Sequence, residues 1–230
     1  MKKINWLELS QFFSNEKIRA SFSMKQSINS EIFKVLDFAK LSGFKHDLIA
    51  IPNQTHSINV KNTTIGGEIL NSDGVFSSNH MVVCSIKVAD CLPIFFAHKT
   101  ELFFGIVHSG WRGLVNGIIS ESIKLIKSSK IALNEIDVFI GPSIQACCFE
   151  VGGDIIDRFN TKFIKQNMNS KYFVNLQGIA KNKLEGEGIL KKHIKVSEDC
   201  TYCQFERYFS FRREGDKSAR MFGLIGVKQK

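Results

Sequence analysis

Three side chains that can bind a metal occur where extended segments are expected to meet turns: His56, Cys91 and His108. Two imidazoles and one thiolate are ligands that Zn²⁺ accepts, and three protein ligands leave a fourth position for water or substrate, as in catalytic zinc sites. The long separations between the three residues do not follow a zinc-finger code. On residue type and spacing alone, the alternative is two structural histidines and a buried cysteine.

The turn after His108 has the composition of a phosphate-binding segment. It reads Gly110-Trp111-Arg112-Gly113 and leads into a helical pattern, so free backbone N–H groups and the positive end of a helix dipole would face an anion. Arg112 could donate two hydrogen bonds to a phosphate, and Trp111 could pack a ring or close a pocket. The alternative places Trp111 in the core and Arg112 in a surface ion pair.

The same stretch also allows a second chemistry. Cys91 could act as a nucleophile with His108 as its base, which would make the protein a cysteine hydrolase acting on amide bonds. Asp90 either orients a ligating histidine through a hydrogen bond or caps a turn, and the sequence favours neither role.

The remaining cysteines and histidines give weaker signals. Cys200-x-x-Cys203 suggests a redox motif or half of a zinc site, but no second pair follows at zinc-finger spacing, which favours a packed turn. Adjacent side chains in an extended segment point in opposite directions, so at most one of Cys147 and Cys148 is expected to face a ligand. Four histidines lie outside any motif and are expected at the surface or in the core: His46, His80, His98 and His193.

Clusters of strands with a few helices are expected to position these residues. Strand candidates at 81–88, 92–97 and 102–107 follow one another closely, as in a meander, and a helical period over 111–127 begins at the glycine-rich turn. Further strands are expected at 18–24, 48–51, 58–60, 136–140, 172–174, 194–196, 208–211 and 221–227, a hairpin and loop at 61–71, and helices at 31–41, 152–166 and 176–192. This order predicts an α+β fold rather than a regularly alternating parallel sheet.

Composition and length set the class of protein. A chain of 230 residues with 43% hydrophobic and 23% charged residues is typical of one globular domain, here expected to span 1–230. The net charge of +9 comes from scattered basic residues without a nucleic-acid-binding motif, so a phosphate-bearing small molecule is the expected anionic partner and nucleic acid is not. The apolar runs are too short to cross a membrane. Charged residues interrupt any signal peptide, and six cysteines are too few for a disulfide scaffold, so a cytoplasmic protein is expected.

Six motifs occur in a characteristic order. They are Gln54-x-His56-Ser57, Asp73-Gly74, Ala89-Asp90-Cys91-x-Pro93, Val107-His108-Ser109-Gly110-Trp111-Arg112-Gly113, Ile140-Gly141-Pro142-Ser143-Ile144 with Cys147-Cys148-x-Glu150-Val151-Gly152, and Cys200-Thr201-x-Cys203 with Phe209-Ser210-x-Arg212-Arg213. In this order they resemble the YfiH family, also called laccase-domain or multicopper polyphenol oxidase proteins, whose members are described as purine nucleoside phosphorylases. The resemblance covers about residues 50–228.

The resemblance implies a single α+β domain of two packed, mixed β-sheets flanked by helices. It implies Zn²⁺ held by His56, Cys91 and His108, with copper as the less favoured metal. The implied partners are phosphate and a purine nucleoside: adenosine, inosine, guanosine or methylthioadenosine would undergo phosphorolysis, and adenosine would also be deaminated. The catalytic set is then His56, Cys91, His108 and Arg112, and substrate or phosphate would meet Lys25, Gln54, Asp90, Gly110, Trp111 and Arg112.

The first quarter of the chain departs from the family pattern. Members often carry a Thr-Arg-x-Gly-Gly run after the early strand and a longer connection before the Gln-x-His motif, whereas this chain has Ser23-Met24-Lys25-Gln26-Ser27 and a short connection. Lys25 can replace the arginine as a point charge but not its planar, bidentate geometry. Weaker or shifted activity is therefore expected.

Two further functions remain as alternatives. A copper phenol oxidase needs several copper ions and more histidines than the six present can organise. A binding protein without turnover would keep the motifs for structural reasons only.

Overall fold

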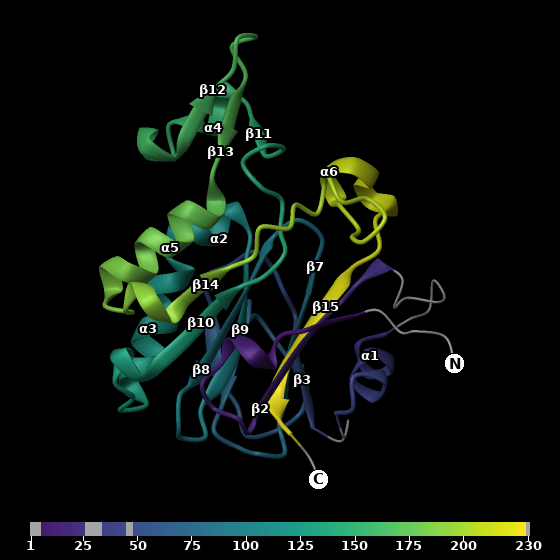
Figure 1. The fold of residues 1–230 in the computed structure, drawn as a ribbon, viewed down its shortest axis with the longest axis vertical. Coiled ribbons are helices and arrows are strands. Elements are labelled where there is room, and N and C mark those ends of the chain that lie inside the picture. Colours follow the sequence, from purple (N-terminus) through teal and green to yellow (C-terminus); the bar gives the residue numbers. More distant parts are fainter. Residues whose placement is uncertain (1–5, 26–33, 45–47, 229–230) are drawn as a thin grey trace.

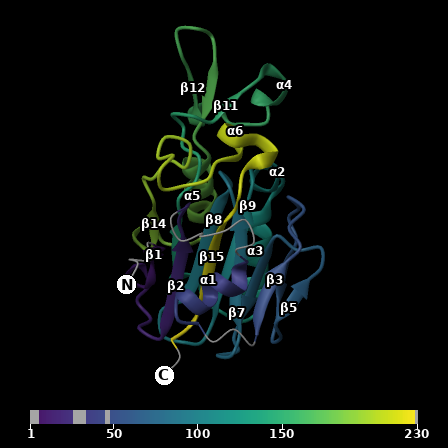
Figure 2. The same cartoon turned by 90° about the vertical axis from the view of Figure 1, so that its right-hand side faces the viewer.

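Two six-stranded sheets pack face to face, with helices packed on their outer faces, in the computed structural model, which describes residues 6–25, 34–44 and 48–228 (Figures 1 and 2). The first sheet has the order β1 (Trp6–Glu8), β2 (Ile18–Ser23), β15 (Met221–Val227), β7 (Val83–Val88), β3 (Ile49–Pro52) and β5 (Gly67–Ile69). The second has the order β14 (Ile194–Val196), β10 (Ile136–Ile140), β8 (Leu92–His98), β9 (Phe104–Ser109), β6 (Gly74–Ser77) and β4 (Val60–Asn62). Each sheet contains parallel and antiparallel pairs, so both are mixed.

The helices and a third, small sheet complete the architecture. The outer face of the second sheet carries α2 (Trp111–Asn116), α3 (Ile118–Ser128) and α5 (Leu176–Glu187), and the first sheet carries α1 (Val35–Leu41) (Figure 1). Strands β11 (Glu150–Val151), β13 (Tyr172–Val174) and β12 (Ile164–Gln166) form the small sheet that projects at the top of Figure 1, beside α4 (Gly153–Ile156). The last helix is α6 (Phe211–Glu214), and 3-10 turns lie at Ser10–Phe12, Leu133–Glu135, Thr161–Phe163, Lys191–His193 and Gly215–Lys217. None of the helices in the described ranges has the length and apolar character needed to cross a membrane.

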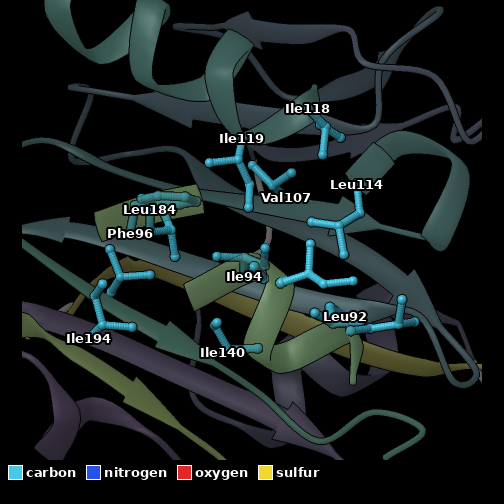
Figure 3. Close-up of a cluster of buried hydrophobic side chains, with 14 of the residues drawn as sticks. Leu92, Ile94, Phe96, Val107, Leu114, Ile118, Ile119, Ile140, Leu184 and Ile194 are labelled. Atoms are coloured by element: carbon cyan, nitrogen blue, oxygen red, sulfur yellow. The ribbon is translucent and has the colours of Figure 1, made fainter. Parts of the chain in front are cut away.

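Strand β8 shows how the sequence builds two cores at once. All seven of its residues are buried, and successive side chains point to opposite faces of the sheet. Ile94 and Phe96 pack against the helices together with Leu114 and Leu184 (Figure 3), whereas Phe95 faces the first sheet. A strand buried on both faces is largely apolar, which is the reason for the run from Leu92 to Ala97 in the sequence.

The helical period after the glycine-rich turn belongs to two helices. Gly117 separates α2 from α3 with φ of +112°, a left-handed conformation that glycine adopts without a steric penalty. Ile118, Ile119 and Ile123 then continue the buried face. The prediction of one helix over 111–127 was correct in face and extent but missed this break.

Several predicted elements were wrong. Strand β7 belongs to the first sheet while β8 and β9 form a hairpin in the second, so the three strands are not one meander. The hairpin expected at 61–71 is instead β4 and β5, which pair in parallel with strands of different sheets. The strand expected at 208–211 gives way to α6, because the Ser210 side chain accepts a hydrogen bond from the Arg213 backbone N–H and caps a helix.

Two predicted helices were too long. The helix over 152–166 is reduced to the single turn α4, followed by a 3-10 turn and β12, and the helix over 176–192 ends at Glu187. For the helix over 31–41, the observed α1 begins at Val35, and residues 31–33 lie outside the described part of the chain. Strands predicted at 18–24, 48–51, 136–140, 172–174, 194–196 and 221–227 are confirmed within two residues at their ends, and the strand predicted at 58–60 is shifted to Val60–Asn62.

Candidate functional site

The three expected metal ligands come together where the two sheets meet. His56 follows β3, Cys91 lies between β7 and β8, and His108 is on β9. One ligand atom from each lies within 4.8 Å of the others. The Cys91 Sγ is 3.8 Å from His56 Nε2, and the two imidazole rings are 4.7 Å apart between centroids and nearly perpendicular. The structure therefore places three donors around one point, the arrangement that a metal ion requires.

The buried carboxylate of Asp73 holds two of these ligands. Its Oδ1 lies 2.8 Å from His108 Nδ1 and accepts the backbone N–H of His56 at 3.0 Å, and its Oδ2 accepts the backbone N–H and the hydroxyl of Ser57, both at 2.7 Å. With Nδ1 bonded to Asp73, His108 has Nε2 available for a metal. His56 has φ of +59°, a left-handed conformation that costs energy for a residue other than glycine and that these backbone hydrogen bonds stabilise.

Gly110 leaves the space that the ligands occupy. A Cβ atom at this position would lie 2.8 Å from His56 Cδ2 and 3.2 Å from Cys91 Sγ. The backbone at the start of α2 thus approaches the ligands more closely than any other residue type would permit. Both this close approach and the His₂Cys donor set fit a bound metal ion.

The electrostatics of the trio favour a thiolate. Burial would raise the pKa of the Cys91 thiol, but the charge and hydrogen bonds of His108 and His56 lower it to about 6. Burial would lower the pKa of His108, but Cys91 and Asp73 raise it to about 9. Burial acts to raise the pKa of Asp73, and hydrogen bonds from His108 and Ser57 lower it to about 2. At neutral pH, Cys91 is therefore in the form that binds metals.

A cavity of about 500 Å³ opens beside the trio. Its size suits a small ligand. It is lined by Gln54, His56, Lys87, Val88, Ala89, Cys91, His108, Phe211 and Arg220. Two cations, Lys87 and Arg220, and one exposed aromatic ring, Phe211, therefore face the space next to the metal ligands, and the Arg220 guanidinium lies 5.6 Å from the centre of that ring. None of the lining residues, all from the described part of the chain, is a carboxylate.

The side chains of Gln54 and Asp90 make hydrogen bonds within the fold, and their substrate-binding roles stay predictions. The Gln54 amide donates to the Lys87 carbonyl and accepts from the Lys87 N–H, both at 2.8 Å, which fixes the end of β3 to β7. The Asp90 carboxylate accepts hydrogen bonds from the Thr201 hydroxyl at 2.6 Å and from the Arg212 backbone N–H at 2.7 Å. These bonds correspond to the turn-capping alternative, and the carboxylate that orients a ligating histidine is Asp73.

Arg112, Trp111 and Lys25 lie outside the cavity lining. The Arg112 guanidinium stacks 4.6 Å above the centre of the Trp111 ring, which itself packs on Phe159. Lys25 lies beside the C-terminal segment, with Nζ 3.6 Å from Glu214 Oε1. Their roles in phosphate binding stay predictions.

Sequence reasoning missed four residues that the structure brings to the site. Asp73 occurs in the Asp73-Gly74 motif without a predicted role, and Phe211 falls in the predicted strand at 208–211. Lys87, on β7, and Arg220, just before β15, are isolated cations and carry no motif. The adjacency of Asp73 to Gly74, within one of the six ordered motifs, was the only signal that could have pointed to this carboxylate.

Comparison with known proteins identifies the family. Residues 32–228 match the sequence profile described as multi-copper polyphenol oxidoreductase laccase. The chain belongs to this family. The resemblance to the YfiH or laccase-domain proteins is thereby confirmed.

Similar members of the laccase-domain family carry a different name. A protein of Haemophilus influenzae, named purine nucleoside phosphorylase, is 31% identical over 180 residues, covering 75% of this chain and 71% of its own. A protein of Aquifex aeolicus with the same name is 32% identical over 205 residues, covering 87% of this chain and 94% of its own.

Solved structures confirm the fold of this laccase-domain chain. YlmD of Geobacillus stearothermophilus has a TM-score of 0.86 at 23% identity, with 94% of each chain covered. The Bacillus licheniformis protein YfiH has a TM-score of 0.88 at 22% identity, covering 99% of this chain and 98% of its own. The predicted α+β class with two packed, mixed sheets is therefore correct.

Proposed function

We propose that the protein is a zinc-dependent purine nucleoside phosphorylase that acts on adenosine, inosine, guanosine and methylthioadenosine. The observation that carries the proposal is the cavity in which two cations and an exposed aromatic ring adjoin the metal ligands. The names of the relatives from Haemophilus influenzae and Aquifex aeolicus support the same activity.

His56, Cys91 and His108 would hold the metal ion. A His₂Cys set suits Zn²⁺ and leaves one position open, as catalytic zinc sites do. When bound, Zn²⁺ supplies Lewis-acid chemistry, polarising a substrate oxygen or lowering the pKa of water. Asp73 keeps the Nδ1 proton of His108 in place, so that the same nitrogen always faces the ligand position.

The cavity residues would bind the two substrates. Lys87 and Arg220 provide charge-assisted hydrogen bonds for phosphate, and Phe211 provides a face for stacking the purine base. In phosphorolysis, a phosphate oxygen forms a bond to the anomeric carbon of ribose, while the bond from that carbon to the base nitrogen breaks and leaves its electron pair on the base. Holding both reactants in one cavity supplies the proximity that this displacement requires. Arg112 and Lys25 are additional candidates for phosphate binding.

Adenosine deamination is the second proposed activity. A zinc ion held by His56, Cys91 and His108 would have one coordination position free for water, and activated water is the nucleophile in zinc deaminases. Those enzymes also use a glutamate as general acid and base, and the cavity lining contains no carboxylate in the described residues. We therefore expect deamination to be slower than phosphorolysis.

The decisive experiment measures base release that depends on phosphate. The zinc-loaded protein should release hypoxanthine from inosine with phosphate present and not without it. His108→Ala should abolish the reaction while circular dichroism shows a folded protein. Absence of phosphate-dependent base release from all four nucleosides would refute the proposal.

The geometry also separates the competing functions. Phenol oxidation by several copper ions needs more imidazoles near one another than the two that meet among the described residues, and His98 accepts hydrogen bonds from the N–H groups of Thr100 and Glu101 instead. For a cysteine hydrolase using Cys91 and His108, removing the metal with a chelator should preserve or increase activity. For the proposed enzyme it should abolish activity, and added Zn²⁺ should restore it.

A further inference from the structure

A second group of thiols lies apart from the His56, Cys91 and His108 site. It consists of Cys147, Cys148, Cys200 and Cys203, whose sulfur atoms all lie within 4.8 Å of one another. The Sγ of Cys203 is 3.6 Å from that of Cys147 and 3.2 Å from that of Cys148. All four are free thiols.

Two turns bring these residues together. The first turn contains Cys147 and Cys148, and the N–H groups of Cys148 and Phe149 both donate to the carbonyl of Gln145 at 2.9 Å. In such a turn both adjacent side chains can face one point, so the expectation that at most one of them would do so was wrong. It assumed an extended backbone.

The second turn carries Cys200 and Cys203. The N–H of Gln204 donates to the Cys200 carbonyl at 3.0 Å, and a parallel bridge joins Cys200 to Ser143. The backbone N–H of Gln145, from the first turn, points at Cys200 Sγ at 3.5 Å. Cys147 and Cys148 therefore provide the second pair of cysteines that the Cys200-x-x-Cys203 motif lacks nearby. The spacing of cysteines in the sequence alone could not show this.

The sulfur geometry corresponds to a closed metal site. With Zn–S bonds of about 2.3 Å, the corners of a regular tetrahedron are about 3.8 Å apart. The separations of 3.2 and 3.6 Å are close to this value and well above the ~2.05 Å of a disulfide bond. A disulfide would also use only two of the four thiols. Packing as small hydrophobic residues accounts for the buried Cys84, but not for Cys147 and Cys203, which are exposed.

We propose that Cys147, Cys148, Cys200 and Cys203 form a structural tetrathiolate Zn²⁺ site. Four protein ligands close the coordination sphere, so this site has a structural role and leaves no position for substrate. It joins the segment after β10 to the segment that precedes α6. Its neighbour Thr201 donates to Asp90, and Arg213 donates to the carbonyls of Thr201 and Tyr202. The proposal is independent of the proposed enzymatic function.

Elemental analysis of variants tests the site directly. We expect protein purified after growth with zinc to contain two zinc ions per chain. The double variant Cys147→Ser and Cys203→Ser should contain one, and the matched variant Cys91→Ser should also contain one, held by the other site. Both exchanged residues of the double variant are exposed, so a folded circular dichroism spectrum is expected. If the His56, Cys91 and His108 site does not load, wild type and Cys91→Ser should both contain one ion, and the double variant none.

Thiol labelling provides a second readout. In the native protein these four thiols should resist alkylation and should become reactive after treatment with a strong chelator. The proposal is overturned if the double variant retains as much zinc as wild type, or if the four thiols of native protein react as fast as in the chelated protein. Finding iron in place of zinc, or a disulfide between two of the cysteines in metal-free native protein, would also overturn it.

Discussion

The Nδ1 atom of His108 lies 2.8 Å from Oδ1 of Asp73, and the same oxygen accepts the backbone N–H of His56. One buried carboxylate thus sets the ring orientation of one metal ligand and the backbone conformation of another. Cys91 is the only member of the trio that Asp73 does not hold directly among the hydrogen bonds described.

Asp73→Asn should weaken both metal binding and folding. The amide would present N–H donors where the site needs acceptors, leaving the backbone N–H groups of residues 56 and 57 with a poorer partner. We expect about 10- to 100-fold lower zinc affinity and about 3 kcal/mol lower free energy of unfolding. Competition with a zinc indicator and urea denaturation measure the two effects. Asp157→Asn at an exposed carboxylate is the control, and equal behaviour of the two variants would contradict the role of Asp73.

The low pKa of Asp73 makes its contribution to the free energy of unfolding depend on pH. Its folded value of about 2 lies below the ordinary 3.8. The carboxylate therefore stabilises the fold fully above about pH 4, and this contribution is lost as the pH falls toward 2. The difference in unfolding free energy between wild type and Asp73→Asn should shrink over this range, and a constant difference would argue against it.

Gly110→Ala should damage the metal site through a single methyl group. The added Cβ would lie 2.8 Å from His56 Cδ2, so the ring or the start of α2 must move. We expect at least about tenfold weaker zinc binding, as for other disturbances of ligand position. Gly186→Ala is the matched control, because nothing lies within 4 Å of its added Cβ. That helical substitution should stabilise the protein by about 0.5 to 1 kcal/mol. Unchanged zinc affinity in Gly110→Ala would show that the close approach is not needed.

In metal-free protein, the pH dependence of Cys91 alkylation should reflect the low pKa of its thiol. Because the folded pKa is about 6 rather than 9, the thiolate forms as the pH rises through 6, and iodoacetamide should alkylate Cys91 with a midpoint there. His108, with a pKa of about 9, stays protonated over the same range and stabilises the thiolate. His108→Ala should shift the midpoint toward 9. Mass spectrometry of the Cys91 peptide measures the rate, and a wild-type midpoint near 9 would exclude the ion pair.

Substitutions of the two cations and of the aromatic ring in the cavity should raise the KM values of different substrates. Lys87→Ala and Arg220→Ala should each raise the KM for phosphate about tenfold, because each removes a charged hydrogen-bond donor. Phe211→Ala should instead raise the KM for the nucleoside about tenfold through lost stacking. Lys124→Ala, at an exposed position of α3, is the control for loss of charge. Unchanged phosphate KM in both cation variants would remove them from the phosphate site.

Short-range patterns in the sequence predicted most strands, and the motifs predicted the three side chains that meet at the site. The apolar runs of β8 and β9 reflect local burial, and the ordered motifs singled out His56, Cys91 and His108. The family resemblance then supplied the packing of the two sheets, which periodicity does not contain.

Long-range partners were the part that the sequence did not reveal. Asp73 and His108 are separated by 35 residues, and Cys147 and Cys203 by 56, so only tertiary folding makes them neighbours. Strand β7 was assigned to the wrong sheet for a related reason: three residues, Ala89 to Cys91, are enough to carry the chain from one sheet to the other, and they resemble an ordinary turn.

Because of this short connection between the sheets, the metal site can form only after the two sheets have docked during folding. His56 leaves one sheet, His108 belongs to the other, and Cys91 lies on the connection, so no single sheet can gather the ligands. At this site, an intermediate with unpacked sheets would bind zinc no better than the unfolded chain. Metal bound at this site during refolding should therefore act after the sheets have docked. It should lower the rate at which the sheets separate and leave the rate at which they associate unchanged. The free energy of metal binding then adds to the stability of the interface between the sheets.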